Sequence, residues 1–444
     1  MIGNLLSGVV LPFFLLLAGA YFTLKLGRYF LAHPKKAVLG MLHADGTGGT
    51  PPARALAVAL AGTLGVGNIA GVATAIALGG AGAVFWMWVA AFLAMSLKYA
   101  EIVLALATRQ HGQMRGGAMY YIKVAFGGRV GRVLAALFAI LLVLLHFTLG
   151  TMIQANAAAE ALQGVFHLPP LAVGLLMGGL AVLLLARGAK QIEDACAMLV
   201  PFACLVFCVL SVGVILLRKG EVPGAFAAIF RGAFTVQSSA SGVLGFLCGG
   251  AVRYGVSRGL VSNEAGCGTA PIAHAASNAK TPAQQGFWGI FEVFVDTILL
   301  CTLTALVILV SGVEPTGGGV YSAIRAYGAV LGGVAPPLLA LLIALFAFAT
   351  VLCWSHYGRE AFSYLIKSDC APRIFLMGVA IATLIGAIVT PSLVWELTDI
   401  VLAVMTLLNL AALFLSRRRI HVETRVFFEG NAVGDSAPTS RRRH

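Results

Sequence analysis

The sequence predicts an all-α integral membrane protein with eleven transmembrane helices. Of its 444 residues, 59% are hydrophobic and only 11% are charged, whereas soluble domains carry about 25% charged residues. Apolar runs long enough to cross about 30 Å of hydrocarbon, which takes about 20 helical residues each, recur along the whole chain. Most Lys and Arg residues stand between these runs. The chain therefore has room for short loops between spans but for no separate soluble domain.

The eleven apolar runs give the predicted spans, whose ends are blurred where glycine interrupts them. They are residues 7–26, 55–76, 82–108, 133–162, 168–187, 195–217, 239–259, 286–312, 330–356, 373–392 and 396–416. We interpret the first as a retained helix and not a signal peptide. Residues 1–8 carry no Lys or Arg, whereas Lys25 and Arg28 follow the apolar run.

The distribution of positive charge predicts the orientation, because loops that hold Lys and Arg stay cytoplasmic. With the N-terminus outside, only four of the 30 Lys and Arg residues lie on the outer side: Arg218, Lys219, Arg231 and Arg325. The C-terminus is then cytoplasmic, and topology accounts for the net charge of +13. Nucleic acid is not an expected partner, because the positive residues are spread over separate loops.

The sequence does not resemble an enzyme. It contains no GxSxG, HExxH or GxxxxGK[ST] motif, so neither hydrolytic chemistry nor ATP use within this chain is expected. Its eight cysteines are scattered without CxxC pairs or a Cys/His spacing that suits zinc. We expect no cofactor and interpret the cysteines as small buried side chains.

Two spans differ from the rest by clustering glycine: GTLGVGNIAG at 62–71 and SSASGVLGFLCGGAVRYG at 238–255. They stand five spans apart, so they are the first helices of two halves if spans two to six and seven to eleven form a repeat. An odd number of spans per half makes the halves inverted. Glycine-interrupted segments at matching positions of two halves indicate a transporter site.

Glycine permits the backbone to unwind, and the peptide groups thus freed need partners inside the membrane. N–H groups at a half-helix N-terminus suit a carboxylate, and carbonyls at the broken end suit a cation. The alternative is close helix packing through small residues, which Gly67 and Gly71 would fit. The neighbouring Asn68 favours a binding site.

Long stretches of the chain resemble the alanine or glycine:cation symporter family, often called sodium:alanine symporters. They are GTLGVGNIAGVATAIALGG at 62–80, the following AGAVFWMWVAAFLAMSLKYAE, RYGVSRGLVSNEAGCGTAPIAHAA at 253–276 and VDTILLCTLTALVIL at 295–309. The resemblance runs from about residue 10 to 415. It implies the inverted five-helix repeat of the bacterial leucine transporter fold plus one extra N-terminal helix. The resulting division is 1–54 for the extra helix and loop, 55–218 and 219–416 for the two repeats, and 417–444 for a disordered, basic cytoplasmic tail.

The resemblance also implies a binding site. The substrate set is Gly65, Gly67, Asn68, Gln154 from the family's MVQAN motif, Gly242, Val243 and Trp354. The cation set, from similarity to the wider fold, is the carbonyls of Ala61, Leu64 and Phe346 with the Thr350 hydroxyl. In the family the seventh span usually reads GGFAG, whereas here Val243 stands in place of the aromatic residue. A wider side-chain pocket is expected.

The predicted function is secondary active transport, in which Na⁺ enters with a small neutral amino acid, alanine or glycine, by alternating access. The protein is expected to act as a monomer in the bacterial inner membrane. One alternative is proton coupling, because Glu292 and Asp296 sit four residues apart on one face of span eight. These acids would otherwise belong to a structural network with Arg253, Arg258 or Asn263. A channel or a substrate-sensing receptor on the same fold is a further alternative.

Overall fold

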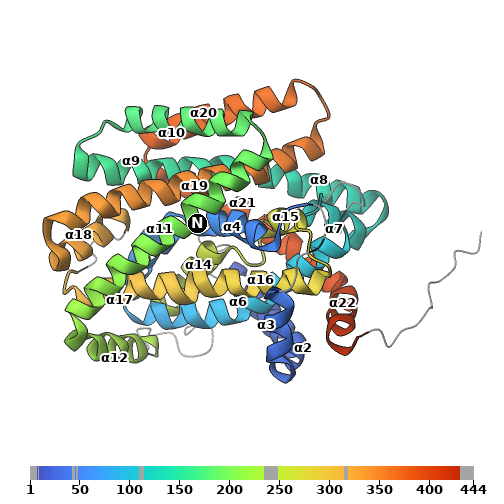
Figure 1. Cartoon of the computed structure of the whole chain (residues 1–444), viewed down its shortest axis with the longest axis horizontal. Helices are drawn as coiled ribbons and strands as arrows, with labels where there is room; N and C mark the ends of the chain where they lie inside the picture. The colour runs from blue at the N-terminus through green and yellow to red at the C-terminus, as the bar shows by residue number, and fades with distance from the viewer. Residues whose placement is uncertain are drawn as a thin grey trace, which may run out of the picture.

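The computed structural model describes residues 8, 10–42, 46, 49–109, 115–234, 249–314 and 319–430, apart from the side chains of 391–393. The described chain is a bundle of helices (Figure 1). Their bounds are α2 Leu11–Ala32, α3 Pro34–Leu42, α4 Pro52–Thr63, η2 Val66–Asn68, α5 Ala70–Gly79, α6 Gly82–Ala107, α7 Ala118–Phe126, α8 Gly128–Leu145, η3 His146–Met152, α9 Ile153–Phe166, α10 Pro170–Ala186, α11 Ala189–Leu217, η4 Lys219–Glu221, α12 Val222–Ala233, α14 Gly250–Asn263, α15 Ala270–Ala275, α16 Pro282–Val293, η5 Phe294–Cys301, α17 Thr302–Val310, α18 Gly319–Leu331, η6 Gly332–Val334, α19 Ala335–Leu365, α20 Ala371–Ile388, α21 Pro391–Leu415 and α22 Arg417–Glu429.

Eight helical segments within the described residues are long and apolar enough to cross a membrane. A ninth span is formed if α4 and α5, which meet at a bend of 62°, are counted together. The apolar helix α10 is shorter, at 17 residues. The prediction of an all-helical, multi-pass membrane protein is confirmed.

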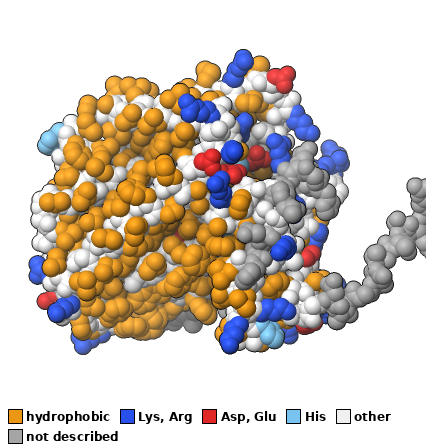
Figure 2. Space-filling view, in the orientation of Figure 1, with side chains coloured by type: hydrophobic (Ala, Val, Ile, Leu, Met, Phe, Trp, Pro, Cys, Tyr) orange, Lys and Arg blue, Asp and Glu red, His pale blue; other side chains and the backbone are white. Residues whose placement is uncertain are grey.

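The distribution of side chains on the protein surface agrees with a multi-pass membrane protein. Most helix axes run from left to right in Figure 1, and Figure 2 shows apolar side chains over most of the face that these helices form. Lys and Arg side chains gather at the right-hand end of this face, near α7 and α22, with few at the left-hand end. Apolar sides and charged ends are the pattern expected of a protein surrounded by lipid.

Helix α6 packs closely against α14 and α16. A Cβ atom at Gly255 of α14 would overlap the backbone of Ala83 on α6. A Cβ atom at Gly286 of α16 would come within 2.7 Å of the Tyr99 ring. Small residues at these crossings let the helix backbones approach, which is the usual way that membrane helices associate.

Part of the predicted disordered tail is helical. Helix α22 covers Arg417–Glu429, and its apolar face buries Ile420 and Phe428. Phe428 stacks on Tyr29 of α2 with ring centroids 5.7 Å apart, and Thr424 accepts a hydrogen bond from the Tyr99 hydroxyl at 3.1 Å. The many basic residues of this segment favoured the prediction of disorder, although its apolar residues share one helical face. Residues 431–444 lie outside the described part of the chain.

Candidate functional site

The second span is interrupted where the sequence predicts a break. Helix α4 ends at Thr63, Gly65 is extended (φ −109°, ψ −154°), and the chain becomes helical again from Val66. A Cβ atom at Gly65 would come within 2.9 Å of both Gln154 Oε1 and Thr350 Oγ1. Glycine therefore stands at the break because two other helices press polar atoms against its backbone.

The break borders a cavity of about 340 Å³. Three of the predicted substrate residues line it: Gly65, Gly67 and Gln154. The lining also includes Thr74 on α5 and Gly319 at the start of α18. The cavity thus extends from the break toward the end of the bundle where α5 finishes and α18 begins.

Gln154 links α9 directly to the break. Its Oε1 accepts a hydrogen bond from the Val66 N–H at 3.3 Å, and its Nε2 donates to the Leu149 carbonyl at 3.2 Å. Leu149 belongs to η3, a π-helical turn that precedes α9. Such turns interrupt the regular ladder and are frequent at functional sites.

Two predicted substrate residues do not line this cavity. The Asn68 side chain is buried against α14 and η5, where its Nδ2 donates to Asp296 Oδ1 at 2.7 Å. Trp354 lies behind the cavity wall, and its Nε1 is 3.4 Å from the Gly62 carbonyl. Gly242 and Val243 lie outside the described residues, so their predicted roles stay predictions.

The structure brings the predicted cation ligands together. Thr350 on α19 donates from Oγ1 to the Ala61 carbonyl at 2.9 Å and to the Phe346 carbonyl at 3.0 Å. Leu64 and Phe346 both line a small void of about 10 Å³ that neither Ala61 nor Thr350 lines. Carbonyl and hydroxyl oxygens are ligands that suit a hard cation.

A second interruption follows α14. Glu264 and two glycines have left-handed backbone conformations, with φ of 53° at Glu264, 85° at Gly266 and 78° at Gly268, before α15 begins at Ala270. The predicted topology places this segment in the cytoplasmic loop between spans seven and eight, and the glycine cluster at 238–255 predicts the break within span seven, where residues 238–248 lie outside the described part of the chain. The EAGCG run at 264–268 is the sequence feature that could have predicted this interruption.

Glu101 on α6 holds the second interruption in place. Its carboxylate accepts the N–H groups of Gly266 at 3.0 Å and Gly268 at 2.8 Å. Asn409 on α21 donates to the same carboxylate and to the Gly266 carbonyl. A buried carboxylate therefore satisfies freed peptide N–H groups in the middle of the bundle, as such groups require in lipid.

Glu264 is a cavity residue that sequence reasoning missed. Its side chain is buried and lines the main cavity, while Oε1 accepts from Trp354 Nε1 at 3.2 Å and Oε2 accepts from Thr269 Oγ1 at 2.8 Å. Arg258 lines the same cavity, and its guanidinium lies 5.1 Å from the centre of the Trp395 ring. An acid and a base in one cavity suit a zwitterion.

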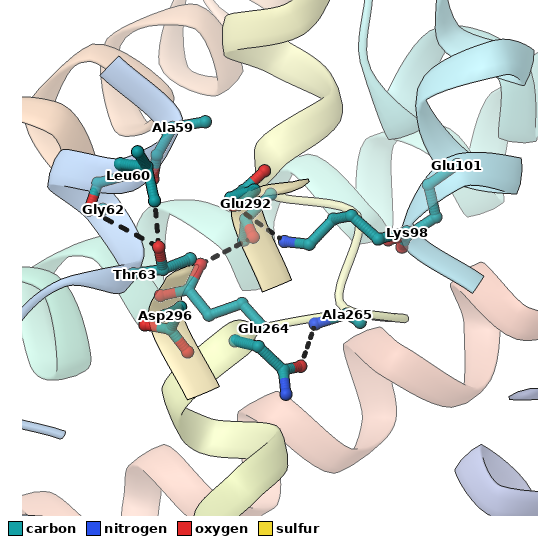
Figure 3. Close-up of polar contacts among 12 residues, drawn as sticks. Ala59, Leu60, Gly62, Thr63, Lys98, Glu101, Glu264, Ala265, Glu292 and Asp296 are labelled. Carbon is teal, nitrogen blue, oxygen red and sulfur yellow. Dashed lines mark hydrogen bonds and ion pairs between the residues drawn. The ribbon is translucent and has the colours of Figure 1, made fainter. Parts of the chain in front are cut away.

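The two acids of span eight have different partners from those expected. Lys98 of α6 extends to Glu292 at 3.2 Å (Figure 3), and His274 Nε2 lies 3.1 Å from the other oxygen of Glu292. Neither Arg253 nor Arg258 contacts Glu292 in the described structure. Asn263 donates to Thr297, beside Asp296, and accepts from the Ala265 N–H. Both arginines lie on α14, which contains the end of the predicted seventh span.

The chain was compared with known proteins. Residues 1–440 match the sodium:alanine symporter family. The sodium/alanine symporter AgcS of Methanococcus maripaludis is 35% identical over 437 residues, covering 94% of each chain. A probable sodium/glutamine symporter, GlnT of Bacillus subtilis, is 32% identical over 93% of this chain and 86% of its own.

The structural comparison extends the likeness at the level of the fold. A manganese transporter of Eremococcus coleocola superimposes with a TM-score of 0.54 at 15% identity, over 88% of this chain and 92% of its own. At that identity only the fold is shared. Since the family match covers nearly the whole sequence and agrees with the interrupted helices, the chain belongs to the sodium:alanine symporter family.

Proposed function

We propose that this protein carries alanine or glycine into the cell together with Na⁺, by alternating access around the interrupted second span. The observation that carries the proposal is the cavity at Gly65 and Gly67, bordered by a broken helix and by a buried acid. The names of the relatives support sodium coupling and an amino acid substrate. A small amino acid fits the residues that face the cavity.

The cavity offers a partner to each end of an amino acid. The N–H groups that begin the η2 and α5 segment, at Gly67 and Asn68, lack intrahelical partners and present a positive dipole end. They would bind the carboxylate, with Gln154 as the neighbouring polar contact. Glu264 would bind the ammonium group, since its carboxylate lines the same cavity.

Na⁺ would bind on the other side of Gly65, between the carbonyls of Ala61, Leu64 and Phe346 and the Thr350 hydroxyl. Thr350 already contacts two of these carbonyls. Filling this site fixes the broken end of α4 against α19, so the ion and the amino acid favour the same arrangement of the break. Such coupling is reciprocal between the two ligands.

The full topology belongs to the same proposal: eleven transmembrane helices, with an inverted five-helix repeat after one extra helix. The N-terminus would be periplasmic, the C-terminus cytoplasmic, and the protein a monomer in the inner membrane. The cavity then opens outward, because α5 ends and α18 begins on the outer side. Substrate would enter in this conformation and leave after one helix bundle rocks against the other.

Transport into sealed proteoliposomes tests the proposal. One charge crossing 100 mV supplies about 2.3 kcal/mol, enough for roughly fifty-fold accumulation at 1.36 kcal/mol per decade. Labelled alanine should accumulate under an inward Na⁺ gradient and not when choline replaces Na⁺. Accumulation that follows pH without Na⁺ would mean proton coupling, and equilibration without accumulation would mean a channel.

A substitution at Glu264 tests the substrate pose. Glu264→Gln keeps the shape of the side chain but removes its charge, so alanine affinity should fall by about tenfold or more, because hydrogen bonds to charged groups contribute about 1.5–3 kcal/mol. The exposed Glu221→Gln provides the matched control. Equal alanine affinities in the two variants would remove Glu264 from the site.

A further inference from the structure

A basic cleft opens where α2 lies beside α22, at the lower right of Figure 1. Its volume is about 520 Å³, and its walls come from positions 21–28 of α2 and 417–422 of α22. Four of the lining side chains are positively charged: Lys25, Arg28, Arg417 and Arg418. Among the residues that the structure describes, no Asp or Glu lines the cleft. Two helices from opposite ends of the sequence therefore bring positive charge to one space.

The four basic side chains of the cleft are not neutralised within the described part of the chain, because none of its ion pairs includes them. His421, which also lines the cleft, responds to this charge. Partial burial, and then the positive charges of Arg28 and Arg425, lower its pKa. Nearby positive charge disfavours the charged form of histidine in this way. An anion in the cleft would relieve the repulsion.

Arg28 is held in the cleft by uncharged partners. Its Nη2 donates to the Tyr29 hydroxyl at 3.1 Å and lies 3.1 Å from His421 Nε2. Its guanidinium carbon lies 4.8 Å from the centre of the Tyr29 ring. Since an arginine can only donate, His421 accepts through Nε2. These contacts fix the guanidinium without cancelling its charge, and its other N–H groups have the planar geometry that suits a phosphate.

An apolar groove adjoins the basic cleft across α2. Its volume is about 740 Å³, and Leu24 and Arg28 line both spaces. The remaining walls come from α3, α6, α16 and the start of η5, and they include Phe92, Met95 and Phe291. Phe92 lies well inside α6, which is long and apolar enough to cross a membrane. The groove therefore reaches from the charged end of α2 into the hydrocarbon region.

A phospholipid with an anionic headgroup matches both spaces at once. Its phosphate would neutralise the basic cleft, and an acyl chain would fill the apolar groove. A soluble phosphate compound matches only the cleft, and a zwitterionic lipid brings a chain but no net negative charge. Basic pockets between membrane helices are the usual binding sites for anionic lipid headgroups.

We propose that the cleft between α2 and α22, together with the adjoining groove, binds one anionic phospholipid. The phosphate contacts Lys25, Arg28 and Arg418, and one acyl chain passes Leu24 and lies along Phe92. The lipid thus ties α2, the first helix that the structure describes, to α22, the last. This site is separate from the amino acid cavity, and the inference holds whichever substrate the protein carries.

Thermal unfolding of the delipidated full chain in a neutral detergent tests the headgroup. Dioleoyl phosphatidylglycerol should raise the unfolding midpoint, whereas dioleoyl phosphatidylcholine should not. Lys25→Gln combined with Arg418→Gln should raise the half-saturating phosphatidylglycerol concentration about thirtyfold, since each basic residue near an anionic lipid contributes about fivefold. Arg187→Gln combined with Lys190→Gln removes the same charges at exposed positions between α10 and α11 and should match the parent protein.

A glycine substitution tests the groove. Gly27 lines it, and a Cβ atom there would meet nothing within 4 Å. Gly27→Leu should therefore leave the lipid-free midpoint no lower than that of the parent, yet weaken stabilisation by phosphatidylglycerol because the new side chain occupies the groove. Gly213→Leu on α11, where a Cβ likewise meets nothing within 4 Å, is the matched control.

Four results would overturn the proposal. Equal stabilisation by the two lipids would mean that the headgroup charge is not recognised. Glycerol phosphate that stabilises the protein as well as phosphatidylglycerol does would mean a site for a soluble anion. An unchanged phosphatidylglycerol dependence in the Lys25 and Arg418 double variant would remove the basic cleft from the site. If that variant does not fold, equal lipid responses of Gly27→Leu and Gly213→Leu would still exclude the acyl chain from the groove.

Discussion

Trp354 of α19 donates a hydrogen bond from Nε1 to Glu264 Oε1 at 3.2 Å, which joins a long continuous helix to the second interrupted segment. Trp354, which was predicted to contact substrate, therefore contacts an acid that lines the cavity and does not line the cavity itself. Its effect on binding follows from how it orients that acid. A substitution of Trp354 should therefore remove the hydrogen bond to Glu264 and keep the aromatic ring.

Trp354→Phe should weaken alanine binding without unfolding the protein. The ring still packs beside Gly150, but Glu264 loses one of its two hydrogen-bond donors. Loss of a bond to a charged group corresponds to about 1.5–3 kcal/mol, so we expect the KM for alanine to rise about ten-fold or more. Trp88→Phe removes an indole bond to Thr302 far from the cavity and should leave KM unchanged. A KM equal to that of Trp88→Phe would contradict the orienting role.

Gly65→Ala should impair transport severely. The added methyl group would press on Gln154 Oε1 and Thr350 Oγ1, both 2.9 Å away, which disturbs the substrate and cation sides of the break together. Gly179→Ala on α10 is the control, because a Cβ there meets nothing within 4 Å. Uptake at parental rates by Gly65→Ala would show that the break tolerates a side chain.

Gln154→Ala should reduce alanine affinity. The substitution removes the acceptor of the Val66 N–H and a polar group from the cavity, at a cost of about 1–3 kcal/mol if the partner stays buried. Competition of labelled alanine by unlabelled alanine measures the change. Gln163→Ala, at an exposed position of the same helix, should behave as the parent does.

Lys98→Met should lower thermal stability strongly. It leaves Glu292 buried with only His274 to balance its charge, and breaking a buried ion pair from one side costs about 3–5 kcal/mol. Adding Glu292→Gln should recover part of the loss, since position 292 then carries no charge. Unfolding followed by light scattering in detergent provides the measurement. A double variant less stable than Lys98→Met alone would contradict this account.

Val243→Phe should narrow the substrate range. The family resemblance places an aromatic residue at this position, so the smaller valine is expected to admit side chains larger than methyl. Competition by serine and glutamine against labelled alanine, compared between the parent and the variant, measures the change. Identical competition profiles would mean that Val243 does not set selectivity.

The membrane class and the break at Gly65 could be predicted because both leave local signals. Apolar runs show directly in composition, and GTLGVGNIAG concentrates glycine within one span. Ala61, Phe346 and Thr350, which similarity to the wider fold predicted to be close together, are close together in the structure. Local chemistry and a long resemblance were sufficient for these features.

Features that depend on how α14 crosses the bundle could not be predicted. Glu264 falls between the predicted spans 239–259 and 286–312, in a glycine-rich stretch that predicts a loop, although the segment is buried against α6 and α21. Asp296, a partner of Asn68, and Lys98, a partner of Glu292, likewise lie more than 190 positions away from these residues in sequence. No periodicity encodes such contacts, since the crossing of whole helices produces them.

The hydrogen bonds from Gly266 and Gly268 to Glu101 make the two interruptions chemically unequal. The protein's own carboxylate already holds the amides of the later break, so an incoming acid group can compete for amides only at the earlier one. An amino acid would therefore bind in a single orientation, with its carboxylate toward η2 and its ammonium group toward Glu264. Chirality at the α-carbon would then be sensed only by what surrounds the side chain, which makes D- and L-alanine a direct probe of that wall.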